Sequence, residues 1–460
     1  MRAEIITIGD ELLIGQVVDT NSAWMAQRLN EMGISLYQIT SVHDNREHIL
    51  KALDEAFSRA DIVLTTGGLG PTKDDITKHV MCEYFGTTLI EDPQVRAHIH
   101  DLYKDRPEAL NRLTATQWLV PQTATILTNR VGSAPIMVFE YKSKVESRKL
   151  KVNESKVESQ KSKVNEISEA VSTDSQHSTL DIQHPKYLIA MPGVPHEMKI
   201  AMTEQVLPFL RLKVKGERLK AMDIVHRTIL VHGIPESKLA ILIEDWENAL
   251  PASIHLAYLP KDGIIRLRLS SYGEATEAEI QSHIDTLLPL ISDYLLATED
   301  ISLEALAGRL LKQQGMTIAT AESCTGGRLA AALNAQSGSS AYYMGSVVAY
   351  DNSVKTNILG VSPEILNTDG AVSESTVRQM AEGVRTLLHT DYAIATSGIA
   401  GPTGGTPDKP VGTIWIAWAT PEGTQAQCFH FGAAREREQI TLRAVTEALV
   451  RLVKCLKSNV

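Results

Sequence analysis

The segment TAESCTGG, residues 320–327, brings together three side chains that can act as nucleophiles. Ser323, Cys324 and Thr325 follow a short apolar run and precede RLAAALNAQ, which has helical spacing. A thiol is intrinsically the best nucleophile of the three, whereas a hydroxyl needs a neighbouring base. The competing interpretation is a helix cap, because Ser is a common N-cap residue. The residue types therefore leave a choice between a nucleophile and a structural turn.

A base for Ser323 is available in the segment YDNSVK. The strand-like run SVVAY ends in Tyr350, and Lys355 follows five residues later. A lysine desolvated beside a hydroxyl can lose its proton near neutral pH and deprotonate a serine directly or through a tyrosine. No His base for Cys324 follows at a recognisable motif position. The structural alternatives are a core tyrosine at a sheet end and a lysine on a solvated helix face.

Backbone amides around the same segment are candidates for stabilising an anion. Gly326 and Gly327 permit close backbone approach, and N–H groups at the start of the following helix are candidates for an oxyanion hole. Glu322 has two interpretations: it holds Lys355 or a substrate hydroxyl, or it is a carboxylate favoured by the helix dipole.

A second glycine-rich loop, ATSGIAGPTGG, follows the strand-like run DYAIA. Its amides suit a ribose phosphate, and an arginine of FGAAREREQ could pair with that phosphate through a charge-assisted fork. Arg435 and Arg437 are equal candidates, and surface arginines that open a helix are the alternative. The candidate loop residues are Ser397, Gly398, Gly401, Thr403, Gly404 and Gly405.

The first part of the chain alternates strand and helix patterns. AEIITIG, ISLYQITSV and DIVLTTGG are strand-like, and the helical stretches between them include one that opens with Asp44 as N-cap and Glu47 at capping-box spacing. Such alternation predicts an α/β fold with a parallel sheet covered by helices on both faces. Ligands of such sheets bind outside the carboxyl ends of the strands.

The loops at those strand ends combine carboxylates with glycines. Amides of TTGGLGPTKDD could cradle a phosphate, and the acidic side chains could hold a divalent ion that bridges phosphates. A tight turn with acidic capping is the alternative, as is a proline-fixed turn for MPGVPHEM, which contains His196 and Glu197. The phosphate candidates are Gly67, Gly68 and Gly70, and the metal candidates are Asp10, Asp74 and Asp75.

Composition limits the remaining options. The chain has 460 residues, a net charge of −10 and four cysteines, Cys82, Cys324, Cys428 and Cys455, without a CxxC pair. The acidic balance gives no general attraction to nucleic acid or an anionic membrane, and the cysteine spacing suggests neither zinc nor disulfides. We identify no export signal and no run of 18 apolar residues, so we expect a cytoplasmic protein.

Three domains are expected along the chain. The first spans residues 1–214 and contains a polar stretch, 142–184, with repeated KVES and KVNE units, which we expect to be a disordered insertion. A small α+β module with the order strand, helix, two strands, helix covers 215–299. An α/β domain covers 300–460.

Several of these motifs resemble the competence/damage-inducible CinA family over nearly the whole chain. TIGDELLIGQVVDTNS, TTGGLGPTKDD and MPGVPHEM resemble its first domain, which is similar to molybdopterin-binding domains. AESCTGG, YDNSVK and TSGIAGPTGG resemble its nicotinamide-nucleotide amidohydrolase domain. The middle module is similar to the family's KH-like domain but has no GxxG in DIVHRTILVHGIPESKLA, which disfavours nucleic-acid binding.

The resemblance implies hydrolysis of nicotinamide mononucleotide to nicotinic acid mononucleotide and ammonia, without a metal or redox cofactor. The family's catalytic Ser, Tyr and Lys map onto Ser323, Tyr350 and Lys355. The first domain resembles metal-dependent pyrophosphatases of ADP-ribose-type substrates, with pterin binding or nucleotidyl transfer as the alternative. A non-catalytic partner in competence or recombination is the alternative of a different class. By analogy we expect nucleotide substrates and a homodimer.

Overall fold

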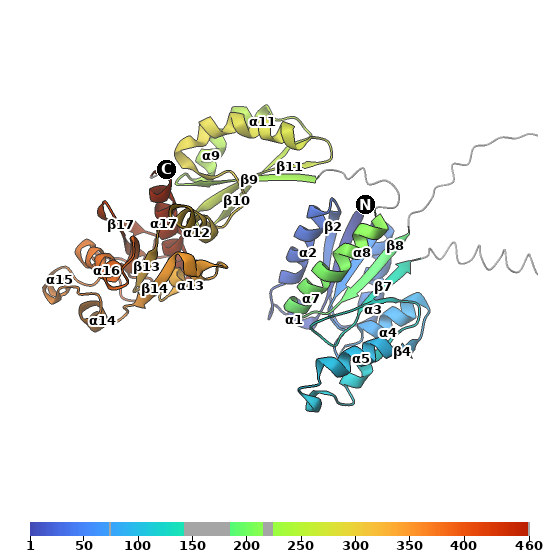
Figure 1. Cartoon of the computed structure of the whole chain (residues 1–460). Helices are drawn as coiled ribbons and strands as arrows, with labels where there is room; N and C mark the ends of the chain where they lie inside the picture. Colours follow the sequence, from blue (N-terminus) through green and yellow to red (C-terminus); the bar gives the residue numbers. More distant parts are fainter. Residues whose placement is uncertain (73–74, 142–184, 215–223, 459–460) are drawn as a thin grey trace, which may run out of the picture. The chain divides into compact units, whose positions relative to one another are not determined.

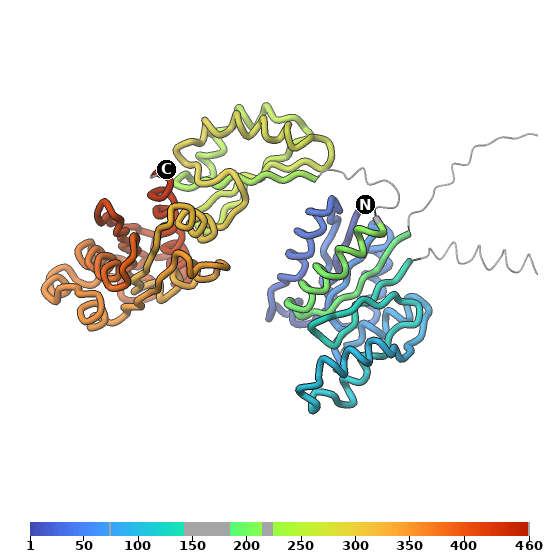
Figure 2. The backbone as a smooth tube through the Cα atoms, viewed as in Figure 1, coloured from blue at the N-terminus to red at the C-terminus, as the bar shows by residue number. Residues whose placement is uncertain are grey.

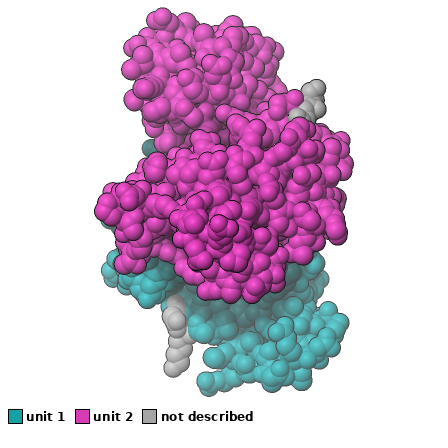
Figure 3. Space-filling view, turned by 90° about the vertical axis from the view of Figure 1, so that its left-hand side faces the viewer, with its two compact units in different colours: residues 1–224 teal, residues 225–460 magenta. Residues whose placement is uncertain are grey.

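The computed structural model describes residues 1–72, 75–141, 185–214 and 224–458. The chain divides into two compact units, residues 1–224 and 225–460, which are coloured separately in Figure 3. The insertion expected at 142–184 and the metal candidate Asp74 lie outside the described residues. In the part of the chain that is described, no helix is both long enough and apolar enough to cross a membrane.

A six-stranded sheet forms the centre of the first unit, with the order β2-β1-β3-β8-β7-β6. Strands β2, β1, β3 and β8 run parallel, as predicted, whereas β7 and β6 extend the sheet antiparallel. A separate antiparallel pair joins β4 to β5. The strands are β1 (Arg2–Ile8), β2 (Ser35–Val42), β3 (Ile62–Thr66), β4 (Leu89–Glu91), β5 (Leu119–Pro121), β6 (Thr125–Leu127), β7 (Ile136–Tyr141) and β8 (Lys186–Met191).

Helices cover both faces of this sheet (Figure 1). Alternation along β1 explains the three layers, because Ala3 and Ile5 pack against α2, α7 and α8, while Ile6 and Ile8 pack against α3 and α4. The helices are α1 (Asp10–Leu13), α2 (Thr20–Glu31), α3 (Arg46–Arg59), α4 (Thr77–Phe85), α5 (Pro93–Leu102), α7 (Pro195–Ala201) and α8 (Leu207–Val214), with short turns η1 (Pro107–Ala109), η2 (Thr114–Trp118) and η3 (Met202–Val206).

The start of α3 differs from the sequence prediction. Asn45, not Asp44, is its N-cap, and the Asn45 side chain accepts hydrogen bonds from the backbone N–H groups of Glu47 and His48. The physical reason is that one Asx side chain can satisfy both amides, so the residue before it is not needed as a cap. Asp44 is thereby free to point elsewhere.

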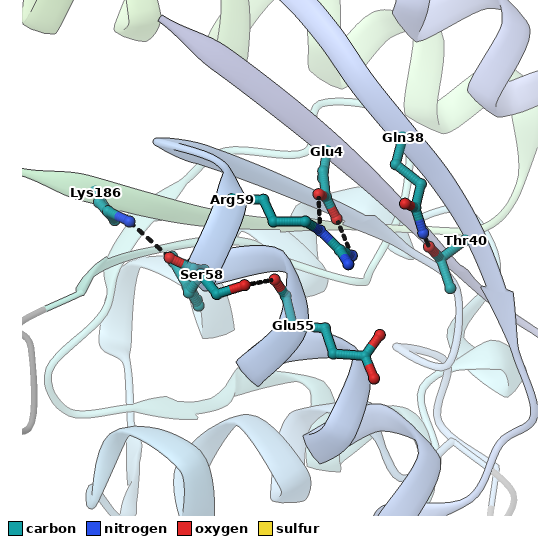
Figure 4. Close-up of polar contacts among 8 residues, drawn as sticks. Glu4, Gln38, Thr40, Glu55, Ser58, Arg59 and Lys186 are labelled. Atoms are coloured by element: carbon teal, nitrogen blue, oxygen red, sulfur yellow. Dashed lines mark hydrogen bonds and ion pairs between the residues drawn. The ribbon is translucent and has the colours of Figure 1, made fainter.

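An ion pair joins the other end of α3 to the central strand (Figure 4). Glu4 is only 1% exposed, and its two carboxylate oxygens accept hydrogen bonds from Arg59 at 2.7 and 3.1 Å. Lys186 of β8 donates to the carbonyl oxygen of Phe57 on the same helix at 2.6 Å. A buried carboxylate is strongly destabilising unless it is paired, so these contacts fix α3 against the sheet.

The second unit begins with the predicted α+β module. Its four-stranded sheet has the order β10-β11-β9-β12, in which β10 pairs antiparallel with β11 and β12 with β9, and one face packs on its helices. The predicted order of elements is confirmed, with β12 as an additional edge strand. The elements are β9 (Ile224–His232), α9 (Glu236–Leu242), α10 (Glu244–Asn248), β10 (His255–Lys261), β11 (Ile264–Tyr272), α11 (Glu277–Leu287), η4 (Leu288–Tyr294) and β12 (Leu295–Ala297).

The rest of this unit is an α/β fold around a five-stranded sheet of order β14-β13-β15-β16-β17, followed as a tube in Figure 2. The first three strands are parallel and the last two antiparallel. Helix α16 covers one face, and α12, α13 and α17 cover the other. The elements are α12 (Leu303–Gln314), β13 (Ile318–Glu322), α13 (Arg328–Asn334), η5 (Ser339–Ala341), β14 (Tyr343–Val348), α14 (Asn352–Asn357), α15 (Pro363–Thr368), α16 (Glu374–Leu387), β15 (Tyr392–Gly398), β16 (Thr413–Thr420), β17 (Gly423–His430) and α17 (Arg437–Ser458).

The module shares part of its core with this α/β fold. Leu230, Ile264 and Leu296 belong to the same buried apolar cluster as α12 and α17. Polar contacts reinforce the junction, since His232 pairs with the buried Glu447 at 3.0 Å. The apolar surface buried there links the stability of the module to that of the α/β fold.

Replacing Leu296 by Ala tests this shared core. The side chain is fully buried, so its truncation should lower the free energy of unfolding by about 2 to 5 kcal/mol. Denaturant unfolding of the intact chain, followed by hydrogen exchange in α12 and α17, measures the effect. Leu290→Ala is the matched control, because Leu290 is 45% exposed and its loss should change stability by about 0.5 kcal/mol or less. Unchanged protection of α12 and α17 in Leu296→Ala would contradict the shared core.

Candidate active sites

The three parallel strands of the C-terminal sheet bring the predicted site loops to one edge. Glu322 at the end of β13 lies in register with Val348 of β14 and Thr396 of β15. The loops that follow these strands therefore start side by side, as expected at the carboxyl ends of parallel strands. They contain Ser323, Tyr350 and the 397–405 loop.

Glu322 binds the first turn of α13. The side chain is fully buried, and its Oε2 accepts hydrogen bonds from the Thr325 hydroxyl at 2.7 Å and from the Gly327 and Leu329 amides at 3.0 Å. Its Oε1 accepts from the Ala330 amide at 2.7 Å. Of the two interpretations of Glu322, the helix carboxylate is therefore correct, because its oxygens are occupied by backbone and hydroxyl donors.

The predicted oxyanion hole needs a correction as a result. The Gly327 amide donates to Glu322, and the Gly326 amide donates to the carbonyl oxygen of Ser323 at 3.2 Å. Neither amide is available to a ligand in this arrangement. The amides of Cys324 and Thr325 have no other residue as acceptor among the described residues. These two amides lie beside Ser323 and take the place of the glycines as candidates.

Ser323 lies in the turn after β13 and does not cap α13. The N-cap position of this helix is Gly327, so the helix-cap interpretation of Ser323 is wrong. Its backbone N–H donates to the Thr396 carbonyl oxygen at 2.9 Å, which continues the sheet by one residue. The side chain is 9% exposed, and its hydroxyl makes no hydrogen bond within the described residues. The oxygen is therefore available to a substrate.

Cys324 is unsuited to nucleophilic attack. Burial raises the pKa of its thiol to about 12, although a hydrogen bond with Thr396 partly opposes this effect. Thr396, which the sequence analysis overlooked, also contacts the Thr325 hydroxyl at 2.7 Å. Its position directly before Ser397 in the glycine-rich loop could have drawn attention to it. A thiolate forms rarely at such a site, so the hydroxyl is the better candidate.

Lys355 is buried. The alternative interpretation, a lysine on a solvated helix face, required it to be exposed. The residue is 1% exposed, and Nζ donates to the carbonyl oxygens of Ala349 and Tyr350 at 2.8 and 2.9 Å. Burial lowers the pKa of the Lys355 amine, while the nearby charges of Asp351 and Cys324 raise it by smaller amounts. The Ala349 amide in turn donates to the Glu322 carbonyl oxygen at 2.8 Å, so an acceptor of the lysine lies beside the residue that precedes Ser323.

Tyr350 contacts Lys355 through its backbone. The side chain is 65% exposed, so it is not the sheet-end core residue of the structural alternative. Its carbonyl oxygen accepts one hydrogen bond from Lys355. The phenol itself is in solvent, and its catalytic role stays a prediction.

The 397–405 loop lies beside the same turn. The Ser397 hydroxyl donates to the Ala371 carbonyl oxygen at 2.6 Å, which anchors the start of the loop. The partly exposed Gly398 packs against β16, and a Cβ there would lie 2.7 Å from the Thr413 carbonyl oxygen. The exposed tip consists of Thr403, Gly404 and Gly405.

The two candidate arginines point to different partners. Arg437 donates to the Gly401 carbonyl oxygen at 2.9 Å, and its charge lowers the pKa of Cys324 slightly. Arg435 donates instead to the Phe431 carbonyl oxygen. Arg437 is therefore the arginine that contacts the glycine-rich loop, whereas Arg435 contacts Phe431.

The N-terminal sheet also opens into a cavity at the carboxyl ends of its parallel strands, of about 550 Å³. The charged residues that line it within the described chain are all acidic: Glu11, Asp19, Asp44, Asp75 and Glu197. The three predicted phosphate glycines, Gly67, Gly68 and Gly70, are part of the wall. Such a wall repels an anion unless a cation accompanies it.

Two of the three predicted phosphate amides are already paired. The Gly67 amide donates to the Met191 carbonyl oxygen at 3.2 Å, and the Gly70 amide donates to Asp75 at 2.8 Å. Asp75 also accepts from the Thr72 amide at 2.9 Å, so its carboxylate closes the loop, as the turn interpretation expected. The Gly68 amide has no acceptor among the described residues and is the one that a phosphate can reach.

The metal candidates are arranged differently from the prediction. Asp10 accepts hydrogen bonds from His43 at 2.8 Å and from the Asp44 amide at 3.3 Å, and the His43 contact lowers its pKa. Among the described residues, no three His, Cys, Asp or Glu side chains are grouped to hold a metal ion. A divalent ion therefore has to draw further ligands from a substrate.

Asp44 is a residue of this cavity that sequence reasoning missed. Its Oδ1 is buried and has no hydrogen-bond partner. Burial raises the pKa of the Asp44 carboxyl, and the charges of Asp10, Glu11 and Asp75 raise it further. The sequence signal was present, but it was interpreted as a helix cap. A carboxylate with one unpaired oxygen beside other acids fits a bound hard cation.

Of the two candidate residues in the MPGVPHEM segment, His196 and Glu197, one is part of the cavity wall. Glu197 lines the cavity and accepts a hydrogen bond from Asn129 at 2.9 Å. His196 is exposed and lies outside the cavity wall.

Comparisons with known proteins cover all three parts of the chain. Residues 4–212 match the family model described as "Probable molybdopterin binding domain", residues 226–296 match "Damage-inducible protein CinA KH domain", and residues 300–456 match "CinA C-terminal domain". A CinA-like protein of Cytophaga hutchinsonii is 42% identical over 98% of this chain and 97% of its own length. The chain belongs to the CinA family.

Two further similar proteins are a second full-length relative and a solved structure that matches about a third of the chain. A CinA-like protein of Flavobacterium psychrophilum is 39% identical over the whole of this chain and 99% of its own length. The crystal structure of the competence damage-inducible protein A (ComA) from Klebsiella pneumoniae is 42% identical over 34% of this chain and 95% of its own, with a TM-score of 0.33. CinA-family membership is consistent with hydrolase activity.

The protonation of Cys324 gives a test of the C-terminal turn in this CinA-family chain. A thiol with a pKa of about 12 instead of 9.0 forms about a thousandfold less thiolate at pH 8. Iodoacetamide should therefore modify Cys324 at least about a thousandfold more slowly in the folded than in the unfolded chain, as measured by mass spectrometry of the peptides. Cys428, which is partly exposed, is the internal control and should react first. Equal rates at the two cysteines would show that the turn is more open than described.

Proposed function

We propose that the C-terminal domain, residues 300–460, hydrolyses the carboxamide of nicotinamide mononucleotide to give nicotinic acid mononucleotide and ammonia. The observation that carries the proposal is the buried Lys355 whose Nζ donates to two carbonyl oxygens near Ser323. An ammonium ion has three N–H donors, whereas a neutral amine has two and a lone pair. Two carbonyl acceptors match the two N–H donors of a neutral amine. The lone pair of that amine is then suited to accept a proton.

Ser323 is the nucleophile in this reaction. As its Oγ bonds to the carboxamide carbon, the hydroxyl proton passes to Nζ of Lys355, directly or through the Tyr350 phenol. The carbonyl oxygen becomes an oxyanion, which the amides of Cys324 and Thr325 are placed to stabilise. Collapse of this intermediate breaks the C–N bond, and Lys355 returns the proton to the leaving ammonia. Water then hydrolyses the acyl ester with Lys355 as base, which releases the carboxylate and restores the serine.

The loop and the arginine account for substrate binding. The nucleotide carries one phosphate, which the guanidinium of Arg437 can bind while Gly401 holds that side chain in place. The amides of the exposed residues Thr403, Gly404 and Gly405 are suited to the remaining phosphate oxygens. Neither step requires a metal or a redox cofactor.

A second activity is proposed for the N-terminal domain, residues 1–214: metal-dependent cleavage of the pyrophosphate of ADP-ribose-type substrates. The specific observation is a cavity whose charged lining is acidic among the described residues. A pyrophosphate enters such a cavity only as a complex with cations, which the lining carboxylates Asp44 and Asp75 would help to hold; Asp10 is not part of the wall and contacts the Asp44 amide instead. A divalent ion would stabilise charge on the phosphate oxygens and activate water. Pterin binding or nucleotidyl transfer is the alternative for this cavity.

Two substitutions test whether the Ser323 hydroxyl or the Cys324 thiol is the nucleophile of the proposed deamidation. Ser323→Ala should lower ammonia release from nicotinamide mononucleotide by at least about a thousandfold, because no attacking oxygen is left. Cys324→Ser, the matched control one residue away, should retain most of the rate, since the thiol is protonated and buried. A coupled ammonia assay on the purified chain measures both. The reverse pattern would identify a thiol enzyme, and no ammonia from the unaltered chain would favour a non-catalytic partner.

The pH dependence of deamidation reports on Lys355. Its pKa is lowered, so the free amine is populated at lower pH than for an ordinary lysine, whose pKa is near 10.5. The rate constant kcat/KM should therefore rise with pH through a step that lies below 10.5 and fall as the amine becomes protonated at lower pH. Lys355→Arg should remove this step together with the activity, because a guanidinium stays protonated. A step at or above 10.5 would exclude Lys355 as the base.

Chelation should separate the two activities. EDTA should abolish hydrolysis of ADP-ribose and leave ammonia release unchanged, because the serine reaction needs no ion. Asp44→Asn and Asp75→Asn should each lower the pyrophosphatase rate by about tenfold or more without altering deamidation. Thin-layer separation of the nucleotide products and the ammonia assay measure the two rates in the same samples. A deamidase that is equally sensitive to EDTA would contradict two independent sites.

A further inference from the structure

A buried oxygen on the wall of the N-terminal cavity has no partner. Asn21 lies in the first turn of α2, lines the cavity and is 8% exposed. Its Nδ2 donates to the Gly193 carbonyl oxygen at 2.7 Å and lies 3.5 Å from the Thr66 hydroxyl. These contacts fix the orientation of the amide. Its Oδ1, an acceptor, makes no hydrogen bond to any described residue.

The unpaired oxygen is not required by the helix. Asp19 is already the N-cap of α2, and its carboxylate accepts the Ser22 amide at 3.0 Å. Nearly all buried polar atoms in folded proteins are hydrogen-bonded, because an unpaired one destabilises the fold. An acceptor held in place and unpaired in a ligand-sized cavity is therefore suited to a donor that the ligand supplies.

The surroundings of Asn21 decide what kind of donor fits. Its neighbours, the Gly193 carbonyl and the Thr66 hydroxyl, are uncharged. A Cβ on Gly193 would lie 3.3 Å from the Gly67 Cα, whereas the Asp44 Oδ1 would lie 3.0 Å from a Cβ on Gly68. The acidic acceptor therefore lies at Gly68, whereas the Asn21 amide is held by Gly193, a residue that packs against Gly67. A cation is attracted to the Asp44 oxygen at Gly68, and a neutral hydroxyl suits the uncharged oxygen of Asn21.

We propose that Oδ1 of Asn21 accepts a hydrogen bond from a sugar hydroxyl of a ribonucleotide ligand, so that Asn21 selects ribose over deoxyribose. The inference rests on the proposed pyrophosphatase function of the cavity, because it assumes that the phosphates bind at Gly68. Asn21 is then a specificity-determining residue that touches the sugar and takes no part in bond cleavage. A ligand that lacks the hydroxyl leaves the buried oxygen unpaired and binds more weakly.

Calorimetric binding to the full chain in the presence of Mg²⁺ tests the proposal without depending on turnover. Two pairs of probes differ in sugar hydroxyls: ADP with 2′,3′-dideoxy-ADP, and ribose 5-phosphate with 2-deoxyribose 5-phosphate. In at least one pair the unaltered protein should prefer the hydroxylated member by about 10- to 100-fold. Asn21→Ala should reduce that preference to about threefold or less. The ratio of two Kd values in one variant is insensitive to the fraction of folded protein.

Two further variants serve as controls. Asn21→Asp keeps an acceptor oxygen but loses the donor to the Gly193 carbonyl, so both affinities should fall while the preference stays above that of Asn21→Ala. Val18→Ala alters another cavity residue, 81% exposed and apolar, and should leave the preference unchanged. Loss of preference in Asn21→Ala with retention in both controls supports recognition by the acceptor oxygen.

The outcomes separate this inference from the proposed activity. If the probes bind with the expected preference but ADP-ribose is not hydrolysed, the inference holds and the pyrophosphatase proposal fails. Equal preference in the unaltered protein and Asn21→Ala, the absence of any preference, or no binding of either pair would overturn the inference. A change in the Mg²⁺ dependence of Asn21→Ala without a change in preference would also overturn it, because Oδ1 would then bind the cation.

Discussion

The C-terminal site depends on one buried carboxylate. Glu322 ends a central strand and accepts hydrogen bonds from the Thr325 hydroxyl and from three amides at the start of α13, and these contacts set the path of the residues in between. The negative charge is stabilised by the helix dipole as well as by the donors. Because those amides are occupied, the turn that carries Ser323 has one shape and presents its hydroxyl and the next two amides. In the proposed reaction, Lys355 can act as a base only because this fixed turn holds the Ser323 hydroxyl in position.

Both candidate sites follow from the same topological rule. Parallel strands end at one edge of a sheet, so loops that are distant in sequence meet there, and small residues let them approach. In the N-terminal unit a Cβ on Gly67 would lie 2.0 Å from the Ile8 carbonyl oxygen, which shows how closely the loops are packed. The two sites differ in charge: a buried amine and an arginine serve the C-terminal site, and carboxylates line the N-terminal cavity. The two proposed functions depend on this difference, since one assigns a nucleotide alone and the other a nucleotide with cations.

Strand and helix periodicity was sufficient to predict the α/β class, the order of elements in the α+β module and the loops that carry the candidate residues. Periodicity could not predict hydrogen-bond partners. A carboxylate such as Glu322 or Asp75 can bind either a ligand or a backbone amide, and the residues beside it in the sequence are the same in both cases. Arg435 and Arg437 could not be distinguished for a related reason, since their directions depend on the loop at Gly401. Asn21 and Asp44 were missed because their unpaired oxygens become evident only when the surrounding donors are known.

The acidic lining of the N-terminal cavity has a consequence for the speed of association. A free nucleotide anion approaches against the field of the carboxylates, so electrostatic steering slows its encounter with the cavity. Added salt screens this repulsion over about 10 Å at 0.1 M, and the association rate of the free anion then rises with ionic strength. A nucleotide whose charge is already neutralised by bound cations would show little such dependence. The acidic lining therefore gives the cation-bound nucleotide a faster association rate than the free anion, and the cation-bound form is also the one that the cavity can accommodate.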